Sequence, residues 1–154
     1  MRRTGRPPRL ATWDYRKPGR YFVTFTTWAR APWLGRLSVE GFAPAPAGAT
    51  VMAVWSELPK WFPRIELSEV AVLPDHVHGL VELREHHDDS ASLGDVVRVW
   101  KAVAAHRIHP QLPEFKWTDG YWDRIVRTES EFETVRAYVS ENVARHLLKL
   151  KVPP

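Results

Sequence analysis

The stretch LPDHVHGLVEL, residues 73–83, places two histidines one residue apart inside a run of valine and leucine. Alternate side chains of a β-strand point to the same face, so His76 and His78 lie together and Val77 faces the other way. A buried strand gains nothing from titratable rings. The pair therefore either lies at a solvated strand edge or forms a two-pronged site for a divalent cation.

The composition limits the kind of protein. The chain has 154 residues, 44% hydrophobic and 26% charged, which suits one globular domain. Without cysteine, disulfides and thiolate metal sites are excluded. No apolar run approaches the roughly 18 residues of a membrane span, and the N-terminus lacks the apolar core of a secretory signal. We therefore expect a cytoplasmic protein without a membrane partner.

The balance of charge favours an acidic partner. Lys and Arg number 22 against 18 Asp and Glu, and the 8 tryptophans include candidates for stacking on unpaired bases, although most tryptophans in small domains are core. We divide the chain into a basic N-terminal arm, residues 1–19, and a single domain, residues 20–154. The arm either tracks DNA or is disordered and binds nothing. Its candidate contacts are Arg2, Arg3, Arg6 and Arg9.

Periodicity predicts an α+β domain. We expect its antiparallel sheet to carry helices packed mainly on one face. Ser92 and Asp95 are spaced to cap the second helix, and Pro59 and Pro63 are placed to end or kink the first. The predicted strands are 20–28, 64–73 and 76–84, with an extended stretch inside 114–127, and the predicted helices are 49–62, 92–108 and 128 to near the C-terminus.

The last helix offers the groups that two histidines lack. Tyr138 and Asn142 are four residues apart and share a helix face, and Asn142 follows Val135 by seven, so it should face the sheet. Its amide oxygen is a hard ligand, and two histidines with one oxygen leave open positions that suit Mg²⁺ or Mn²⁺. Tyr138 is alternatively an amphipathic anchor at the rim of a core.

Other chemical signatures are weaker. No glycine-rich phosphate loop, serine elbow or cysteine nucleophile is present, so a nucleophile must be Tyr, Ser or Thr. Lys101 is a candidate phosphate contact, or simply a solvated helical charge. The cluster at 86–89, His-His-Asp-Asp, is interpreted as a solvated charge run in a loop.

Five stretches of the chain follow one another in a set order: YFVTFTT (21–27), ELPKWFP (57–63), AVLPDHVHGLVEL (71–83), SLGDVVRVWK (92–101) and GYWDRIVRTESEFETVRAYVSEN (120–142). Together they resemble the single-tyrosine transposases of the HUH endonuclease superfamily, and most closely the REP-associated tyrosine transposases of bacteria. The order and spacing carry this resemblance over nearly the whole chain.

The resemblance implies a ferredoxin-like antiparallel sheet with the histidine pair on a central strand. It implies that His76, His78 and Asn142 are metal ligands and that Tyr138 is the nucleophile. The family often has proline directly after the asparagine, whereas this chain has Val143, so no proline ends the helix there.

The function that this resemblance implies is a metal-dependent, single-stranded DNA endonuclease and strand transferase. It would nick and rejoin DNA near REP hairpins through a 5′-phosphotyrosine, with Mg²⁺ or Mn²⁺ as cofactor and single-stranded or hairpin DNA as partner. Two alternatives stay open, a noncatalytic hairpin-binding module and a metal-dependent phosphoesterase that uses water. The protein is expected to act as a monomer or a homodimer.

Overall fold

The computed structural model describes residues 13–151, and the side chains of residues 13–142. The predicted arm contacts at positions 2, 3, 6 and 9 lie outside the described residues. Along the chain the elements are β1 (Gly19–Thr26), the 3-10 turn η1 (Trp28–Arg30), β2 (Gly35–Ser38), β3 (Gly41–Pro44), α1 (Pro46–Trp61), β4 (Ile65–Val72), β5 (His76–Leu83), α2 (Leu93–Ile108), β6 (Trp122–Val126) and α3 (Glu129–Lys151).

The main sheet is antiparallel, with strand order β4-β5-β1-β6, and β2 and β3 form a separate hairpin. When this hairpin and α3 are set aside, the remaining order β-α-β-β-α-β is that of a ferredoxin-like fold. The predicted α+β class and the antiparallel sheet are confirmed.

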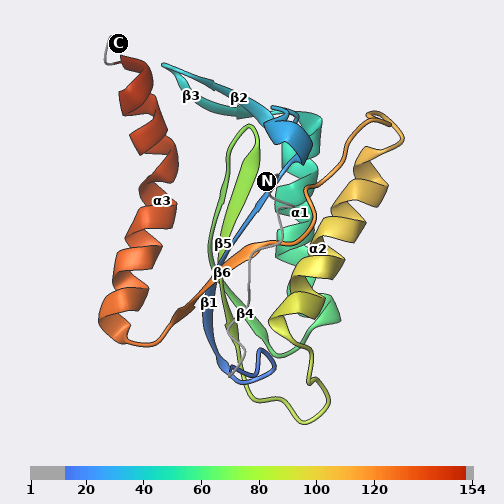
Figure 1. Ribbon diagram of the computed structural model, residues 1–154, viewed down its shortest axis with the longest axis vertical. Coiled ribbons are helices and arrows are strands. Elements are labelled where there is room, and N and C mark those ends of the chain that lie inside the picture. The colour runs from blue at the N-terminus through green and yellow to red at the C-terminus, as the bar shows by residue number, and fades with distance from the viewer. Residues whose placement is uncertain (1–12, 152–154) are drawn as a thin grey trace, which may run out of the picture.

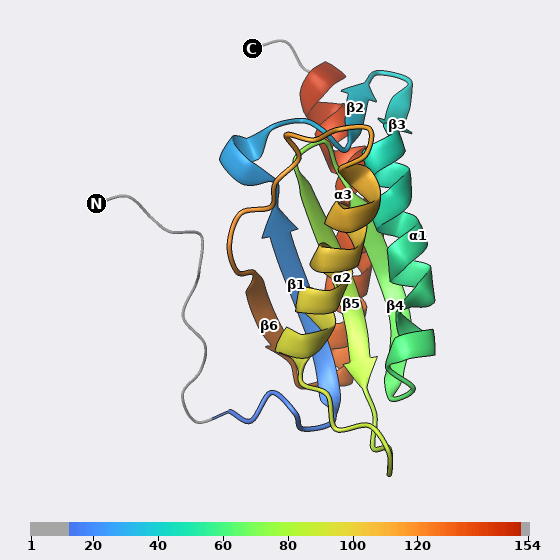
Figure 2. The same ribbon diagram turned by 90° about the vertical axis from the view of Figure 1, so that its right-hand side faces the viewer.

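The helices form two layers around the sheet. α1 and α2 cover one face, as expected for helices packed mainly on one side, and α3 lies alone against the opposite face (Figure 1). Turned by 90°, the molecule shows α2 in front of the sheet and α3 behind it (Figure 2). The face of the sheet that carries α3 is therefore covered by a single helix.

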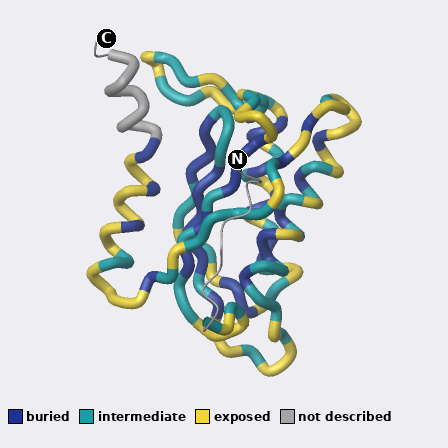
Figure 3. Tube along the Cα trace, viewed as in Figure 1, coloured by how far each residue is buried: buried dark blue, intermediate teal, exposed yellow. Residues whose placement is uncertain are grey.

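Side chains that alternate along a strand pack against the helices on the two opposite faces of the sheet. In β5, Val77 and Val81 join the large core under α1 and α2, whereas Leu80 joins a smaller core with Val135 and Val139 of α3. Figure 3 shows the resulting band of buried residues through the central strands. Both faces of the sheet are covered, which explains the continuous apolar runs in the sequence.

The end of α2 follows the expected chemistry, and α1 differs from the prediction in two ways. The Ser92 side chain accepts a hydrogen bond from the Asp95 amide at 3.1 Å, and the Asp95 carboxylate accepts one from the Ser92 amide at 3.0 Å, which confirms the capping box of α2. α1 begins three residues earlier than predicted, since Pro46 lacks only an N–H that the first turn does not use. It also continues through Pro59 as far as Trp61, because a proline in the last turn removes only one hydrogen bond.

α3 runs without interruption past Asn142 as far as Lys151, as expected where residue 143 is not proline. Its start is fixed by the Thr128 hydroxyl, which accepts a hydrogen bond from the Glu131 amide at 3.0 Å. Among the described residues, no helix is both long and apolar enough to cross a membrane.

Candidate active site

The two histidines of β5 lie side by side on an inner strand, as predicted. Their ring centroids are 4.9 Å apart, with the ring planes at 76°. β5 runs between β4 and β1, and His78 is in register with Ala71 on one side and Thr24 on the other. Because Val77 belongs to the core under α1 and α2, both imidazoles face the α3 side of the sheet.

Each imidazole makes a protein contact through the same ring nitrogen. His76 Nδ1 lies 2.7 Å from Asp75 Oδ1, and His78 Nδ1 lies 2.8 Å from the Thr24 hydroxyl. The nitrogen that each ring can offer to a cation is therefore Nε2. Partners on Nδ1 also restrict the rotation of the rings, which is how proteins orient histidine ligands.

Asp75 is an ionised partner for His76. Burial of the carboxyl raises its pKa, but hydrogen bonds with His76 and Arg30 and the charge of Arg30 lower it more, so the pKa lies below its usual range. Arg30 Nε donates to Asp75 Oδ2 at 2.9 Å. A negatively charged carboxylate is therefore held next to the Nδ1 atom of His76.

α3 brings Tyr138 to the histidines. Its ring centroid is 5.8 Å from that of His78 and 6.0 Å from that of Phe22, which itself stacks on His78 at 5.3 Å. The neighbouring Val135 and Val139 are buried in the smaller core and fix this part of the helix on the sheet. Tyr138 keeps 37% of its surface exposed, so a substrate can reach it.

Asn142 follows Tyr138 by one helical turn and points inward. Only 2% of its surface is exposed, and its Oδ1 is a buried oxygen. Imidazole nitrogens and an amide oxygen are neutral donors of the kind that suits a small divalent cation with remaining positions for other oxygens. In the part of the chain that the structure describes, no three His, Cys, Asp or Glu side chains group as metal ligands.

The other sequence candidates lie away from this cluster. The Lys101 ammonium donates to the carbonyl oxygens of Thr118 and Gly120, each at 2.8 Å, and so holds the loop before β6. Burial lowers the pKa of Lys101 to about 8. Tyr121 packs against the large core on the face opposite to the histidines. In the 86–89 loop His87 and Asp88 are exposed, as interpreted, whereas His86 and Asp89 are half-buried, and Asp89 accepts hydrogen bonds from the Arg64 and Ala91 amides.

Sequence reasoning missed the residues that support the cluster. Phe22 and Thr24 contact His78, and Asp75 and Arg30 support His76. A local signal existed only for Asp75, which directly precedes His76 in the sequence. The other three depend on strand register or on a turn, which periodicity does not give.

The fold and the cluster define a class of α+β protein in which a histidine pair on the sheet lies next to a tyrosine of a covering helix, with a buried asparagine one helical turn further along that helix. The family model described as "Transposase IS200 like" matches residues 54–142, a range that contains all four of these side chains. The chain belongs to the IS200-like transposase family.

Individual relatives are distant. A protein of Haemophilus influenzae, named only as uncharacterized, is 24% identical over 153 residues, covering 87% of this chain and 85% of that protein. The structure of a REP-associated tyrosine transposase bound to a REP hairpin superposes with a TM-score of 0.67 at 20% identity, over 90% of this chain and 74% of that one. A crystal structure from Deinococcus radiodurans R1, assigned as a transposase, gives a TM-score of 0.55 at 17% identity, over 88% and 97%. At these identities the two structures show a shared fold.

Proposed function

We propose that this chain is a metal-dependent endonuclease and strand transferase acting on single-stranded DNA near hairpins. In this proposal Tyr138 is the nucleophile, and His76, His78 and Asn142 hold Mg²⁺ or Mn²⁺. The proposal places the protein in the cytoplasm with its DNA, as a monomer or a homodimer. The Deinococcus structure and the hairpin-bound structure support the fold on which it rests.

One observation carries the proposal. A partly exposed tyrosine lies 5.8 Å, centroid to centroid, from a histidine whose own neighbour is a second histidine at 4.9 Å. These side chains come from two elements that are far apart in sequence and are fixed by separate contacts. A nucleophile one helical turn from a candidate ligand reaches the same phosphate that the ligand set serves.

The chemistry is a transesterification. When bound, a divalent cation supplies charge neutralisation at a non-bridging oxygen of the scissile phosphate. Tyr138 Oη attacks phosphorus, the bond to the 3′ oxygen breaks, and the phenol proton passes to that oxygen. The products are a 5′-phosphotyrosine and a free 3′-hydroxyl, so attack by a 3′-hydroxyl reverses the step and rejoins the strand.

Each of the residues around Tyr138 and the two histidines has its own role in this reaction. The Phe22 ring of β1 contacts the Tyr138 ring in a T-shaped arrangement, with the centroids 6.0 Å apart. The Thr24 hydroxyl and the Asp75 carboxylate hold the two imidazoles. Lys101 and the arm residues Arg2, Arg3, Arg6 and Arg9 stay predicted contacts to DNA phosphates, and the loop contacts of Lys101 give it a second role.

The experiment is a trapping assay with single-stranded oligonucleotides that carry hairpins from the gene's own flanks. The label belongs on the 3′ end, because the fragment downstream of the nick is the one that becomes joined to tyrosine. With Mn²⁺, a labelled band at the mass of the protein plus DNA on a denaturing gel is expected, and it should disappear with a chelator or in His76→Ala. Cleavage without such a band would favour the water-using phosphoesterase, and hairpin binding without cleavage would favour the noncatalytic module.

A further inference from the structure

A chain of contacts runs from the η1 turn to the first histidine. Arg30 Nε donates to Asp75 Oδ2 at 2.9 Å, and the other carboxylate oxygen, Oδ1, lies 2.7 Å from His76 Nδ1. Each oxygen of Asp75 therefore has its own partner. The side chains of Asp75 and His76 are largely shielded from solvent, whereas the Arg30 side chain is 60% exposed.

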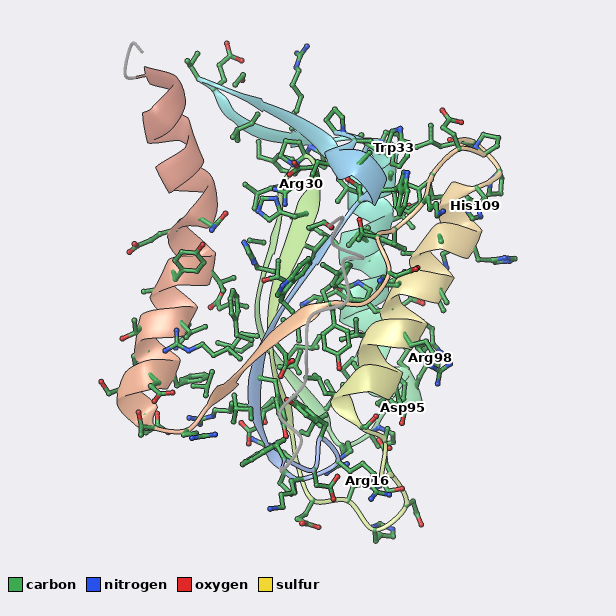
Figure 4. All side chains as sticks on the ribbon, in the orientation of Figure 1. Arg16, Arg30, Trp33, Asp95, Arg98 and His109 are labelled. Carbon is green, nitrogen blue, oxygen red and sulfur yellow. The ribbon has the colours of Figure 1, made fainter. Side chains whose placement is uncertain are left out.

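The backbone holds this chain of contacts in place. The Asp75 carbonyl oxygen accepts hydrogen bonds from the Thr27 amide at 3.0 Å and the Thr27 hydroxyl at 3.2 Å. Ala29 and Arg30 both have a positive φ, 55° and 56°, a conformation that residues with side chains disfavour. Arg30 lies at the η1 end of the sheet (Figure 4), and its Nε reaches Asp75 in the turn between β4 and β5.

The two histidines differ in what their partners permit. A hydroxyl can donate or accept, so Thr24 accommodates either tautomer of His78. A carboxylate only accepts, so Asp75 requires the hydrogen of neutral His76 on Nδ1 and leaves the Nε2 lone pair for a ligand. We propose that Asp75, oriented by Arg30, is a positioning residue that fixes His76 in the tautomer able to bind a divalent cation.

The proposal rests on the proposed metal site but makes a prediction that needs no metal. In Asp75→Asn, the amide oxygen is the group that can accept from Arg30, so the amide nitrogen turns toward His76. An N–H donor facing Nδ1 requires that nitrogen to accept, which moves the imidazole hydrogen to Nε2. Asp75→Asn should therefore reverse the tautomer of His76 rather than merely weaken the preference for a hydrogen on Nδ1. Adding Arg30→Ala frees the amide to flip and should restore the Nδ1 hydrogen.

The test is the imidazole nitrogen chemical shifts of the metal-free protein, measured by long-range ¹H–¹⁵N NMR at alkaline pH, where imidazole is neutral. His109 is an internal reference of the opposite kind, because its Nε2 lies 2.8 Å from the Phe115 carbonyl oxygen and must carry the hydrogen. The parent should show His76 with hydrogen on Nδ1, Asp75→Asn on Nε2, and the double variant on Nδ1 again. Asp88→Asn is the matched control, since Asp88 pairs with His87 in the exposed loop.

Mn²⁺ affinity by calorimetry is the second readout. Loss of such a histidine partner typically lowers metal affinity about 10- to 100-fold, and we expect Asp75→Asn to lose Mn²⁺ affinity by this factor. The double variant should recover part of the lost affinity. Asp88→Asn should bind Mn²⁺ as tightly as the parent. An Nδ1 hydrogen on His76 in Asp75→Asn, or an unchanged Mn²⁺ affinity in a variant with the reversed tautomer, would overturn the proposal. A parent that shows the predicted tautomers and binds no Mn²⁺ would instead contradict the proposed function and, with it, the metal part of this inference.

Discussion

Lys101 is a half-buried charge, and the cost of removing its ammonium from water can be measured directly. Burial of its ammonium lowers its pKa from 10.5 to about 8 in the folded protein. Below pH 8 the lysine is charged both folded and unfolded, and the folded state bears the full cost of a poorly solvated charge. Between pH 8 and 10.5 the unfolded chain still binds the proton that the folded protein has released, so stability should rise with pH.

The size of this rise follows from the two pKa values. Each pH unit between them is worth about 1.4 kcal/mol, and most of the gain is complete by pH 10, so the parent should gain about 2 to 3 kcal/mol between pH 7 and pH 10 from this group. In a domain of this length that equals roughly 4–12 °C in the thermal midpoint. Because the neutral amine still donates N–H groups, the bonds to Thr118 and Gly120 can survive the deprotonation.

The assay is denaturant unfolding of the parent and of Lys101→Met at both pH values. Methionine cannot titrate, so the stability difference between the two proteins should move by about 2 to 3 kcal/mol in favour of the parent at high pH. Lys60→Met, which changes an exposed helical lysine, is the control. A stability difference that does not change with pH would refute the reasoning.

The same variant tests the predicted phosphate contact. Binding to single-stranded DNA should weaken steeply with salt, and each neutralised phosphate adds about 0.7 to the slope of log affinity against log salt. If Lys101 contacts a phosphate, Lys101→Met lowers that slope by about 0.7. An unchanged slope would assign the ammonium to the Thr118–Gly120 loop alone.

The other consequences concern the metal and the packing beneath it. Mn²⁺ at a hundredfold excess over its dissociation constant should stabilise the parent by about 2.7 kcal/mol, roughly 5–11 °C, and the double variant His76→Ala/His78→Ala should lose this shift in a thermal melt. An equal shift in the double variant would remove the ligand assignment. Gly79→Ala should cost about 1–3 kcal/mol, because a Cβ there would lie 3.0 Å from the Trp55 ring and 3.2 Å from the Trp100 ring. A denaturant midpoint equal to that of the parent would show that the two indoles move aside.

Local patterns predicted the parts of the site that local geometry fixes. The period of two along β5 placed His76 and His78 on one face, and the period of a helix placed Tyr138 and Asn142 on one side of α3. The capping pair at the start of α2 was also readable, because both partners lie within four residues. Each of these depends only on backbone geometry that a short segment adopts by itself.

The rest depends on contacts between distant segments. Nothing in the strand pattern says that Thr24 pairs with His78 rather than with a neighbour, since a register shift leaves the apolar alternation intact when it moves by two residues. The Arg30 contact depends on a turn in a disfavoured conformation. Tyr121 and Tyr138 lie on opposite faces of the sheet because α3 covers the face away from the large core. The sequence alone does not say which face α3 covers.

The nucleophile is the central claim, and one measurement tests it most directly. Parent, Tyr138→Phe and Tyr121→Phe are each incubated with Mn²⁺ and a 3′-labelled single-stranded hairpin oligonucleotide, and the DNA-linked peptide is identified by mass spectrometry. Because phenylalanine keeps the ring contacts of Tyr138 with His78 and Phe22, folding and DNA binding should survive in Tyr138→Phe. The account predicts a covalent adduct on the peptide that contains Tyr138 in the parent and in Tyr121→Phe, and none in Tyr138→Phe. An adduct that persists in Tyr138→Phe and is lost in Tyr121→Phe would contradict it.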